Sequence, residues 1–400
     1  MVYLNDEIFD WIERHLDDDP KSLALKYSGK ADWIPFAVTQ IECRKRSSKK
    51  LSETLKNRRF VFPSLLSAEQ STSDLVASFH ASLISGCSSV LDLTCGLCID
   101  AFHIAESAKS VTAIDINPSA VECARHNATI LGIDNIDVVC KDCAQFLQAH
   151  NDKYDVVFID PARRSSSGGR VYALSDCQPD VVKLMPLIKR EAKRLIIKMS
   201  PMLDPQQIIK ELPNIKRLYS IGTSNECKEL VAEIIFDEAN DDIELQAVTM
   251  QGSYDEGGEK MTFYLNDEIS SSLTYQTPLP GNFLYVPYPS VSKLMPFKLL
   301  SERFGIGKLA VNSHIYASPV YTEQFPGHIY NIESVVPFTK AEIKKFSAQY
   351  PQINIATRNF MLSPEELRKR LKTKDGGNHY LFATTLQDSN KVLIVCTRRK

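Results

Sequence analysis

Hydrophobic and polar positions in the middle of this chain alternate in the manner of an α/β domain. Short apolar runs of strand length recur along this part of the chain, and the longer stretches between them have helical spacing. The segments that contain the runs are 90–100, 113–118, 138–143, 154–164 and 194–201. Strands that alternate with helices predict a doubly wound α/β fold with a mainly parallel sheet.

Acidic side chains stand at the ends of the first three apolar runs. Asp92 comes before a turn that contains Gly96, Asp115 follows 23 residues after Asp92, and Asp142 ends the third run. A ribose-binding acid commonly lies ~20 residues beyond a nucleotide-binding turn, at the carboxyl edge of such a sheet. Backbone N–H groups at the following helix start can also hold a cofactor. The pattern predicts an adenosine site, and Cys98 in place of a later glycine disfavours NAD.

The segment 90–118 resembles motifs I and II of the class I S-adenosylmethionine-dependent methyltransferases. The resemblance implies a Rossmann-like sheet of seven strands whose last strand is antiparallel, formed here with residues 218–222 and 230–236. It implies S-adenosyl-L-methionine as the cofactor. It also assigns cofactor-binding roles to Asp92, Gly96 and Asp100 in the first loop, to Asp115 at the ribose, to Asp142 at the adenine amino group, and to Gln70 and Ser71 in a segment that closes over the cofactor. Cys98 departs from the glycine of that family.

The fourth apolar run ends in Asp160 and Pro161, which we expect to carry the chemistry. This pair resembles both the Asp/Asn-Pro-Pro motif of nucleic-acid amino methyltransferases and the Asp-Pro-Pro-Arg motif of RNA uracil-C5 methyltransferases. Methylation of a nitrogen needs hydrogen-bond acceptors, which the Asp160 carboxylate and the Pro161 carbonyl would supply. Methylation of a pyrimidine carbon needs a nucleophile, normally a cysteine on the next strand. Residues 194–201 contain no cysteine, which favours nitrogen and leaves Cys177 as the alternative nucleophile.

Basic residues near this motif and near the start of the chain are candidates for phosphate contact. Arg163, Arg164 and Arg170 surround a Ser/Gly-rich turn, and guanidinium groups bind phosphate in a bidentate manner. Residues 44–59 contain eight basic residues and one acid, with Trp33 and Phe60 nearby as stacking surfaces. The alternative for each segment is a solvated surface without a ligand.

The chain of 400 residues is longer than one methyltransferase core and predicts several domains. We expect a helical segment over residues 1–75, the methyltransferase core over 76–240, strands and a small mixed connector over 241–325, and a compact α/β module over 326–400. In the last module the patterns predict helices at 339–349 and 363–372 and strands near 328–336, 353–357, 379–384 and 392–396.

The last module resembles the THUMP-like domain that accompanies a group of bacterial methyltransferases. The segments that carry this resemblance are 357–360 and 374–377, which contain Arg358 and Lys374. THUMP domains bind RNA in tRNA-modifying enzymes, so the resemblance implies structured RNA, either tRNA or rRNA, as the partner. Arg358 and Lys374 are then candidate RNA contacts.

Composition adds few constraints. The formal net charge is −2, and ten cysteines are too dilute for a disulfide scaffold. No signal peptide or apolar run of about 18 residues is evident, so we expect a cytoplasmic protein without a membrane span. The pairs Cys95/Cys98 and Cys140/Cys143 have metal-ligand spacing, but a metal there would occupy the nucleoside site, and we expect none.

These observations favour an RNA methyltransferase that acts on a base nitrogen. Two other functions remain open. The Cys98 substitution and the single proline of the Asp160 motif are compatible with a catalytically idle RNA-binding protein on a methyltransferase fold. A small-molecule methyltransferase would use the same cofactor site but would have no use for the basic ends of the chain.

Overall fold

The computed structural model describes residues 4–163, 174–238, 241–251 and 258–399. Two compact units make up this chain. Of the described residues, the first unit holds those up to Lys216 and those from 230 to 238, and the second unit holds the others. Within the described ranges, no helix combines the length and the apolar character that a membrane span requires.

The first unit begins with a group of short helices, as the sequence predicts. They are α1 (Asp6–Arg14), α2 (Pro20–Lys26), α3 (Ile34–Ser47), the 3-10 helix η1 (Thr54–Lys56) and α4 (Leu65–Gln70). Polar side chains cap several of them, and Asp19 with Pro20 at the first helical position starts α2. The apolar faces of α1, α2 and α3 pack into one cluster, in which the ring of Trp11 meets those of Tyr27 and Trp33.

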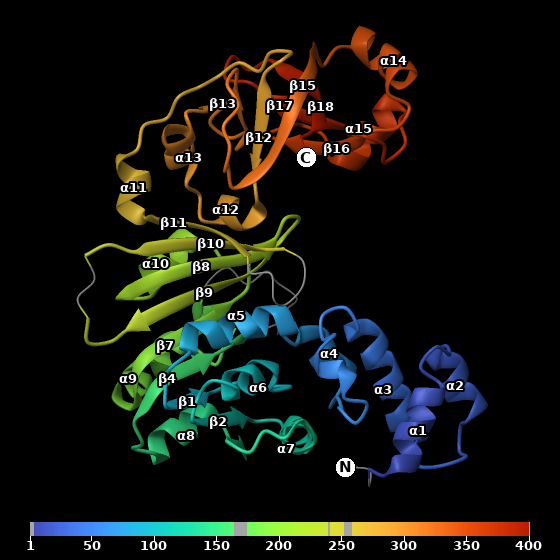
Figure 1. Ribbon diagram of the computed structural model, residues 1–400, viewed down its shortest axis with the longest axis vertical. Coiled ribbons are helices and arrows are strands. Elements are labelled where there is room, and N and C mark those ends of the chain that lie inside the picture. The colour runs from blue at the N-terminus through green and yellow to red at the C-terminus, as the bar shows by residue number, and fades with distance from the viewer. Residues whose placement is uncertain (1–3, 164–173, 239–240, 252–257, 400) are drawn as a thin grey trace. The chain divides into compact units, whose positions relative to one another are not determined.

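A mixed sheet forms the centre of the first unit (Figure 1). Its parallel strands are β1 (Ser89–Asp92), β2 (Ser110–Asp115), β3 (Ile136–Cys140), β4 (Tyr154–Ile159) and β7 (Ala192–Met199). Strand β9 (Cys227–Ile235) runs antiparallel to β7, and the order is β8-β9-β7-β4-β1-β2-β3, with β8 spanning Ile215–Thr223. This is the predicted seven-stranded arrangement, and the division between the units falls inside β8 and β9.

Helices alternate with the parallel strands, as the pattern predicts, and the first of them precedes β1. They are α5 (Asp74–Ile84), α6 (Ile99–Ala105), α7 (Pro118–Leu131), α8 (Cys143–Ala149), α9 (Val181–Glu191) and α10 (Pro205–Glu211). Ser64 caps α4 and Ser73 caps α5, each accepting a backbone N–H three residues ahead. Short pieces β5 (Ala162–Arg163), η2 (Leu174–Asp176) and β6 (Cys177–Gln178) lie beyond the end of β4.

The sheet does not end near residue 240, where the sequence suggests that the core closes. Strand β10 (Glu244–Met250) pairs in parallel with β8, and β11 (Gly258–Tyr264) pairs antiparallel with β10. These strands belong to the second unit. The segment after 240 is therefore a sheet extension, because the side chains of Leu245, Ala247 and Val248 are buried in it.

A second sheet, of order β13-β14-β12-β15-β18-β17-β16, fills the rest of the second unit (Figure 1). Its strands are β12 (Phe283–Pro287), β13 (Gly307–Lys308), β14 (Tyr316–Ser318), β15 (Gly327–Pro337), β16 (Asn354–Arg358), β17 (His379–Thr385) and β18 (Lys391–Arg398). The helices are α11 (Leu265–Ser270), α12 (Pro289–Lys293), α13 (Phe297–Phe304), α14 (Lys340–Gln349) and α15 (Pro364–Leu371). The elements predicted for the last module are confirmed. Strands β12 and β15 pair across the expected boundary at 325/326, so one sheet contains both segments.

Candidate functional site

The carboxyl ends of β1 and β4 are joined by hydrogen bonds that run through one threonine. The Thr94 backbone N–H donates to Asp92 Oδ1 at 3.0 Å, and Thr94 Oγ1 accepts the backbone N–H of Asp160 at 2.7 Å. Asp92 is only 1% exposed. Burial, with the negative charges of Asp100, Asp160 and Asp115, raises the pKa of Asp92 well above its ordinary value. The predicted acids thus lie at one edge of the sheet.

The loop after β1 is tied to the end of β2. The Gly96 N–H donates to Asp115 Oδ2 at 2.9 Å, and the Cys95 N–H donates to the Ile114 carbonyl at 2.8 Å. Gly96 has a positive φ of 52°, and a side chain at this position would meet open space. The loop therefore presents bare backbone to the space beside Asp115, which is what close approach of a ligand requires.

Cys98 takes over the backbone role of the glycine that it replaces. It adopts a left-handed conformation with φ 63° at the start of α6, and its side chain is fully buried. A hydrogen bond between the thiols of Cys95 and Cys98, together with burial, raises the pKa of Cys95. For Cys98 that hydrogen bond lowers the pKa, but burial together with the negative charges of the nearby aspartates outweighs it, and the pKa of Cys98 is also raised. The Cys98 side chain consequently occupies the protein interior and leaves the exposed side of the loop clear.

Asp115 and Asp142 lie where the sequence predicts, at the ends of β2 and β3. Asp115 is half-buried, and its Oδ1 also accepts the Asn117 N–H at 2.8 Å. Asp142 caps α8 through the Gln145 N–H at 3.0 Å. Ile116, which sequence reasoning missed, is 68% exposed next to Asp115 and offers an apolar surface to a flat ring. The sequence feature that could have identified Ile116 is an apolar residue directly after the acid at the end of the strand.

Asp100 has a different environment from the other predicted cofactor residues. Its Oδ2 accepts from the Thr72 hydroxyl at 2.5 Å, and its Oδ1 lies 2.7 Å from His80 Nδ1. Burial alone would raise the pKa of Asp100, but the charges of Lys198 and His80 and these hydrogen bonds lower it below the ordinary value. Asp100 thus contacts protein groups that the sequence did not identify, namely Thr72, His80 and Lys198.

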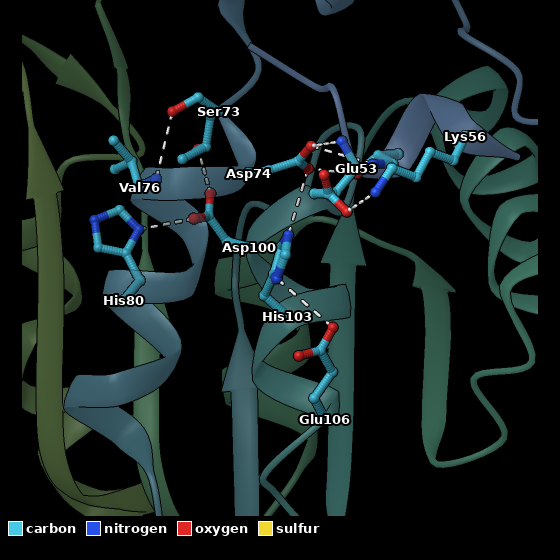
Figure 2. A network of polar contacts seen from close by, with 11 residues as sticks. Glu53, Lys56, Ser73, Asp74, Val76, His80, Asp100, His103 and Glu106 are labelled. Carbon is cyan, nitrogen blue, oxygen red and sulfur yellow. Dashed lines mark hydrogen bonds and ion pairs between the residues drawn. The ribbon is translucent and has the colours of Figure 1, made fainter. Parts of the chain in front are cut away.

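Figure 2 shows two carboxylate–histidine pairs between α5 and α6, of which Asp100 with His80 is one. The other joins Asp74 Oδ1 to His103 Nε2 at 3.4 Å. Asp74 also accepts the Glu53 N–H at 2.8 Å and the Thr54 N–H at 3.1 Å. Burial would raise the pKa of Asp74, but the hydrogen bonds from His103 and Thr54 lower it. This second pair anchors the N-terminal helices on α5.

Asp160 lies at the end of β4 with its side chain 38% exposed, and Pro161 is buried. Its Oδ2 accepts from Lys198 Nζ at 2.5 Å. Lys198 is on β7, and sequence reasoning missed it. The feature that could have identified it is a lysine inside the otherwise apolar run 195–199. The carboxylate that we expect to act on substrate is therefore reachable from solvent and ion-paired on its buried side.

The candidates that follow Asp160 are only partly described. Arg163 lies on β5, opposite Cys177 on β6, whereas Arg164 and Arg170 lie outside the described residues. Cys177 is 3% exposed. Buried thiols are generally unreactive, because nucleophilic attack requires an accessible thiolate. This burial argues against Cys177 as the alternative nucleophile.

The basic segment 44–59 is used largely inside the protein. Phe60, proposed as a stacking surface, is fully buried, and Trp33 packs in the helical cluster. Arg44 is buried and donates to the Arg58 and Phe60 carbonyls. Ion pairs join Arg46 to Glu42 and Glu69, Lys56 to Glu53, Arg58 to Asp10 and Glu13, and Arg59 to Asp6. Four of the eight basic side chains are thus paired with acids, which reduces the positive charge available for phosphate; contact of this segment with phosphate stays a prediction.

Gln70 and Ser71 stand where α4 ends. Gln70 is exposed, and the Ser71 hydroxyl donates to the Ala68 carbonyl at 3.1 Å. The next residue, Thr72, contacts Asp100 and Lys198, so the segment reaches the site through Thr72. Gln70 and Ser71 themselves remain predictions.

Arg358 and Lys374 are both exposed in the second unit. Arg358 ends the edge strand β16, and Lys374 lies beside the residues that precede this strand, since its N–H donates to the Pro351 carbonyl at 2.9 Å. With a rise of about 3.3 Å per residue, the two positions are about 20 Å apart. They do not form one cluster but mark opposite ends of one strand.

The residues at the carboxyl edge fit S-adenosyl-L-methionine in the chemistry of their donors and acceptors. Asp115 offers carboxylate oxygens suited to ribose hydroxyls, and Gly96 leaves space for close approach. Among the described residues, no group of His, Cys, Asp and Glu side chains is arranged to hold a metal ion.

Three family matches divide the chain. A methyltransferase domain matches residues 84–249, a ferredoxin-like domain matches 283–326, and a THUMP domain-like family matches 327–398. A protein of Porphyromonas gingivalis W83 that is assigned as a methyltransferase, and whose crystal structure is known, is 30% identical in sequence to this chain. It covers 100% of both chains with a TM-score of 0.88.

Curated relatives match over shorter stretches. An uncharacterized S-adenosylmethionine-dependent methyltransferase of Mycobacterium tuberculosis is 31% identical over 44% of this chain and 48% of its own. The 23S rRNA uracil-C5 methyltransferase RlmC of Pectobacterium atrosepticum is 33% identical over 24% of this chain and 25% of its own. This chain therefore spans between a quarter and a half of the length of these relatives.

Proposed function

Since this chain belongs to the same methyltransferase family as the Porphyromonas gingivalis protein, we propose that it methylates a base nitrogen in structured RNA, tRNA or rRNA, in the cytoplasm, with S-adenosyl-L-methionine as the methyl donor. The observation that carries the proposal is the position of Asp160. Its half-exposed carboxylate shares one sheet edge with Asp115, and Thr94 links it to the loop that begins at Asp92.

The cofactor-binding residues that we propose are Asp115 for the ribose, Asp142 for the adenine amino group, and Asp92 and Gly96 in the loop around the methionine end. When bound, the cofactor supplies an electrophilic methyl group on a positively charged sulfur. Asp92 is buried and accepts from the Thr94 backbone, so it orients the loop from behind. Asp115 restrains the same loop through the Gly96 N–H, and its carboxylate would also accept from the ribose hydroxyls.

Asp160 and the Pro161 carbonyl would accept hydrogen bonds from the target nitrogen and hold it in line with the methyl carbon, about 3 Å away. So held, the nitrogen lone pair would be directed at the methyl group that the cofactor supplies, and the N–H proton that the amine loses would pass to solvent on the exposed side of Asp160. Orientation at this step, without a covalent enzyme intermediate, is what the residues of this chain contribute.

Carbon methylation is the main alternative, because RlmC acts on a uracil carbon. That chemistry needs an accessible cysteine next to the target. Residues 192–201 contain no cysteine, and Cys177 is buried. These two observations favour nitrogen as the methylated atom.

RNA as the substrate is supported by the THUMP-like match and by the partial relationship to RlmC. Arg358 and Lys374 are exposed in this part of the chain, and we propose that they contact RNA phosphates. Arg163, Arg164 and Arg170 follow the reactive motif in the sequence, and we propose the same for them near the target base.

The test is transfer of an isotope-labelled methyl group from the cofactor to RNA purified from cells that lack this protein. We expect label in the RNA fraction with the unmodified enzyme and none with Asp160→Ala. Label in small molecules instead would favour the small-molecule alternative. Cofactor binding without transfer to any fraction would favour an idle RNA-binding protein.

A further inference from the structure

A buried ammonium group supports the reactive carboxylate from the interior of the first unit. Lys198 lies near the end of β7, and its side chain is 10% exposed. Its Nζ donates to Asp160 Oδ2 at 2.5 Å and to Thr72 Oγ1 at 2.8 Å, and it lies 3.9 Å from Asp100 Oδ2. Asp160 is the only one of these partners that the sequence analysis assigned to catalysis.

The groups behind Lys198 come from three separate elements. Thr72 precedes α5, Asp100 is in the first turn of α6, and His80 on α5 lies 2.7 Å from Asp100. Figure 2 shows Asp100 and His80 facing each other across α5 and α6. Because Thr72 donates to Asp100 while it accepts from Lys198, the ammonium is held in one position by a chain of directed hydrogen bonds.

We propose that Lys198 is a positioning residue that keeps Asp160 an ionised hydrogen-bond acceptor, and that this restricts the target to a base nitrogen that carries a hydrogen. The proposal rests on the RNA methyltransferase function and specifies its substrate class. An ionised carboxylate offers lone pairs and no hydrogen. An exocyclic amine donates an N–H to it, whereas a ring nitrogen without hydrogen has only a lone pair to present and would be repelled by the carboxylate.

The contact between Lys198 and Asp160 also decides between two roles for Asp160, which are to orient the target amine or to remove its proton. An ammonium 2.5 Å away stabilises the negative charge and makes the carboxylate a weaker base. The carboxylate then orients the amine without removing its proton before methyl transfer. An asparagine, which keeps one oxygen acceptor and has no charge to neutralise, should perform this orienting role in part and should not depend on Lys198.

A second lysine on the same strand provides a matched control. Lys193 of β7 pairs with Asp155 of β4 at 2.7 Å, as Lys198 pairs with Asp160, but its side chain is 73% exposed. Lys193→Met removes the same charge from the same pair of strands, and we expect turnover within about twofold of the unmodified enzyme, because exposed pairs contribute little.

The experiment is a double-mutant cycle in kcat for RNA methylation. We expect Lys198→Met to lower kcat about 100-fold through misplacement of Asp160, with cofactor affinity nearly unchanged. Lys198→Arg should restore most of this loss. In an Asp160→Asn background, Lys198→Met should change kcat less than about threefold, because the charge through which it acts is gone. Thermal unfolding of each variant identifies any loss that comes from misfolding.

Several results would overturn the proposal. Equal effects of Lys198→Met in both backgrounds would show that Lys198 does not act through the charge of Asp160. A completely inactive, folded Asp160→Asn would indicate proton removal by the carboxylate. A methylated nucleoside whose target nitrogen carried no hydrogen, such as 1-methyladenosine, would contradict the substrate class. If the unmodified enzyme methylates no RNA at all, the proposed function fails and this inference fails with it.

Discussion

Replacement of Asp115 by alanine should weaken cofactor binding more than it weakens the fold. The side chain accepts the Gly96 N–H at 2.9 Å and the Asn117 N–H at 2.8 Å, and it is half-buried at the end of β2. In the proposed complex it also accepts from the ribose hydroxyls. Asp115→Ala therefore removes the ribose contact and releases the loop that contains Gly96.

The magnitude follows from the type of hydrogen bond. Hydrogen bonds to a charged group contribute about 1.5–3 kcal/mol, so the loss of the ribose contact should raise Kd about 10- to 150-fold. The two backbone N–H groups can bond to water once the half-buried side chain is removed, so their loss should cost only about 1–3 kcal/mol together in the free energy of unfolding. Asp115→Asn keeps one oxygen acceptor and loses the charge, so its Kd should lie between those of the unmodified protein and Asp115→Ala.

Isothermal titration calorimetry of the full chain with S-adenosyl-L-methionine measures these changes. Asp137→Ala is the matched control, because Asp137 is an exposed carboxylate on the neighbouring strand β3, and its Kd should equal that of the unmodified protein. An Asp115→Ala protein that is folded and binds the cofactor as tightly as the unmodified protein would refute the assignment of Asp115 to the ribose.

Three further predictions concern catalysis and stability. Asp160→Ala should abolish methyl transfer while cofactor affinity persists, and Cys177→Ser should leave activity near normal; an adduct with 5-fluoropyrimidine RNA on a denaturing gel would reverse both roles. Asp74→Ala should lower the free energy of unfolding by about 3–5 kcal/mol in urea titrations, because buried N–H donors and a histidine lose their acceptor; a change below about 1 kcal/mol would contradict this account. Burial and the charges of Lys308 and Arg358 lower the pKa of His314 from 6.5 to about 4, so its folded state prefers the neutral ring. The stability from this group should be fully present above pH 6.5 and be lost as the pH falls toward about 4, and His314→Gln should remove that dependence from melting curves; an unchanged dependence would show that other groups cause it.

The candidate site could be predicted from the sequence because the carboxyl ends of parallel strands lie at the same edge of the sheet. Asp92, Asp115 and Asp160 each follow an apolar run, and the hydrogen bonds through Thr94 and Gly96 bring them to one edge as expected. The last module was predicted in detail for a similar reason. Its strands alternate regularly, and Ser363 caps α15 with Pro364 at the first helical position, as the local sequence indicates.

The sequence did not identify the support of Asp160, because that support depends on distant contacts. Lys198 and Thr72 are 126 residues apart in the chain, and no local pattern brings them together. The charge of the basic segment 44–59 also depends on distant contacts. Asp6, Glu13 and Glu69, which pair with three of its basic side chains, lie outside the segment, so its local sequence overstates the charge available to a ligand.

The most direct test of the central claim is mass spectrometry of RNA nucleosides from cells that lack this protein and carry either the unmodified gene or its Asp160→Ala form. We predict one methylated nucleoside, modified at a nitrogen, that appears with the unmodified gene and is absent with Asp160→Ala. Identical nucleoside profiles in the two strains, or a difference confined to a carbon-methylated pyrimidine, would contradict the account.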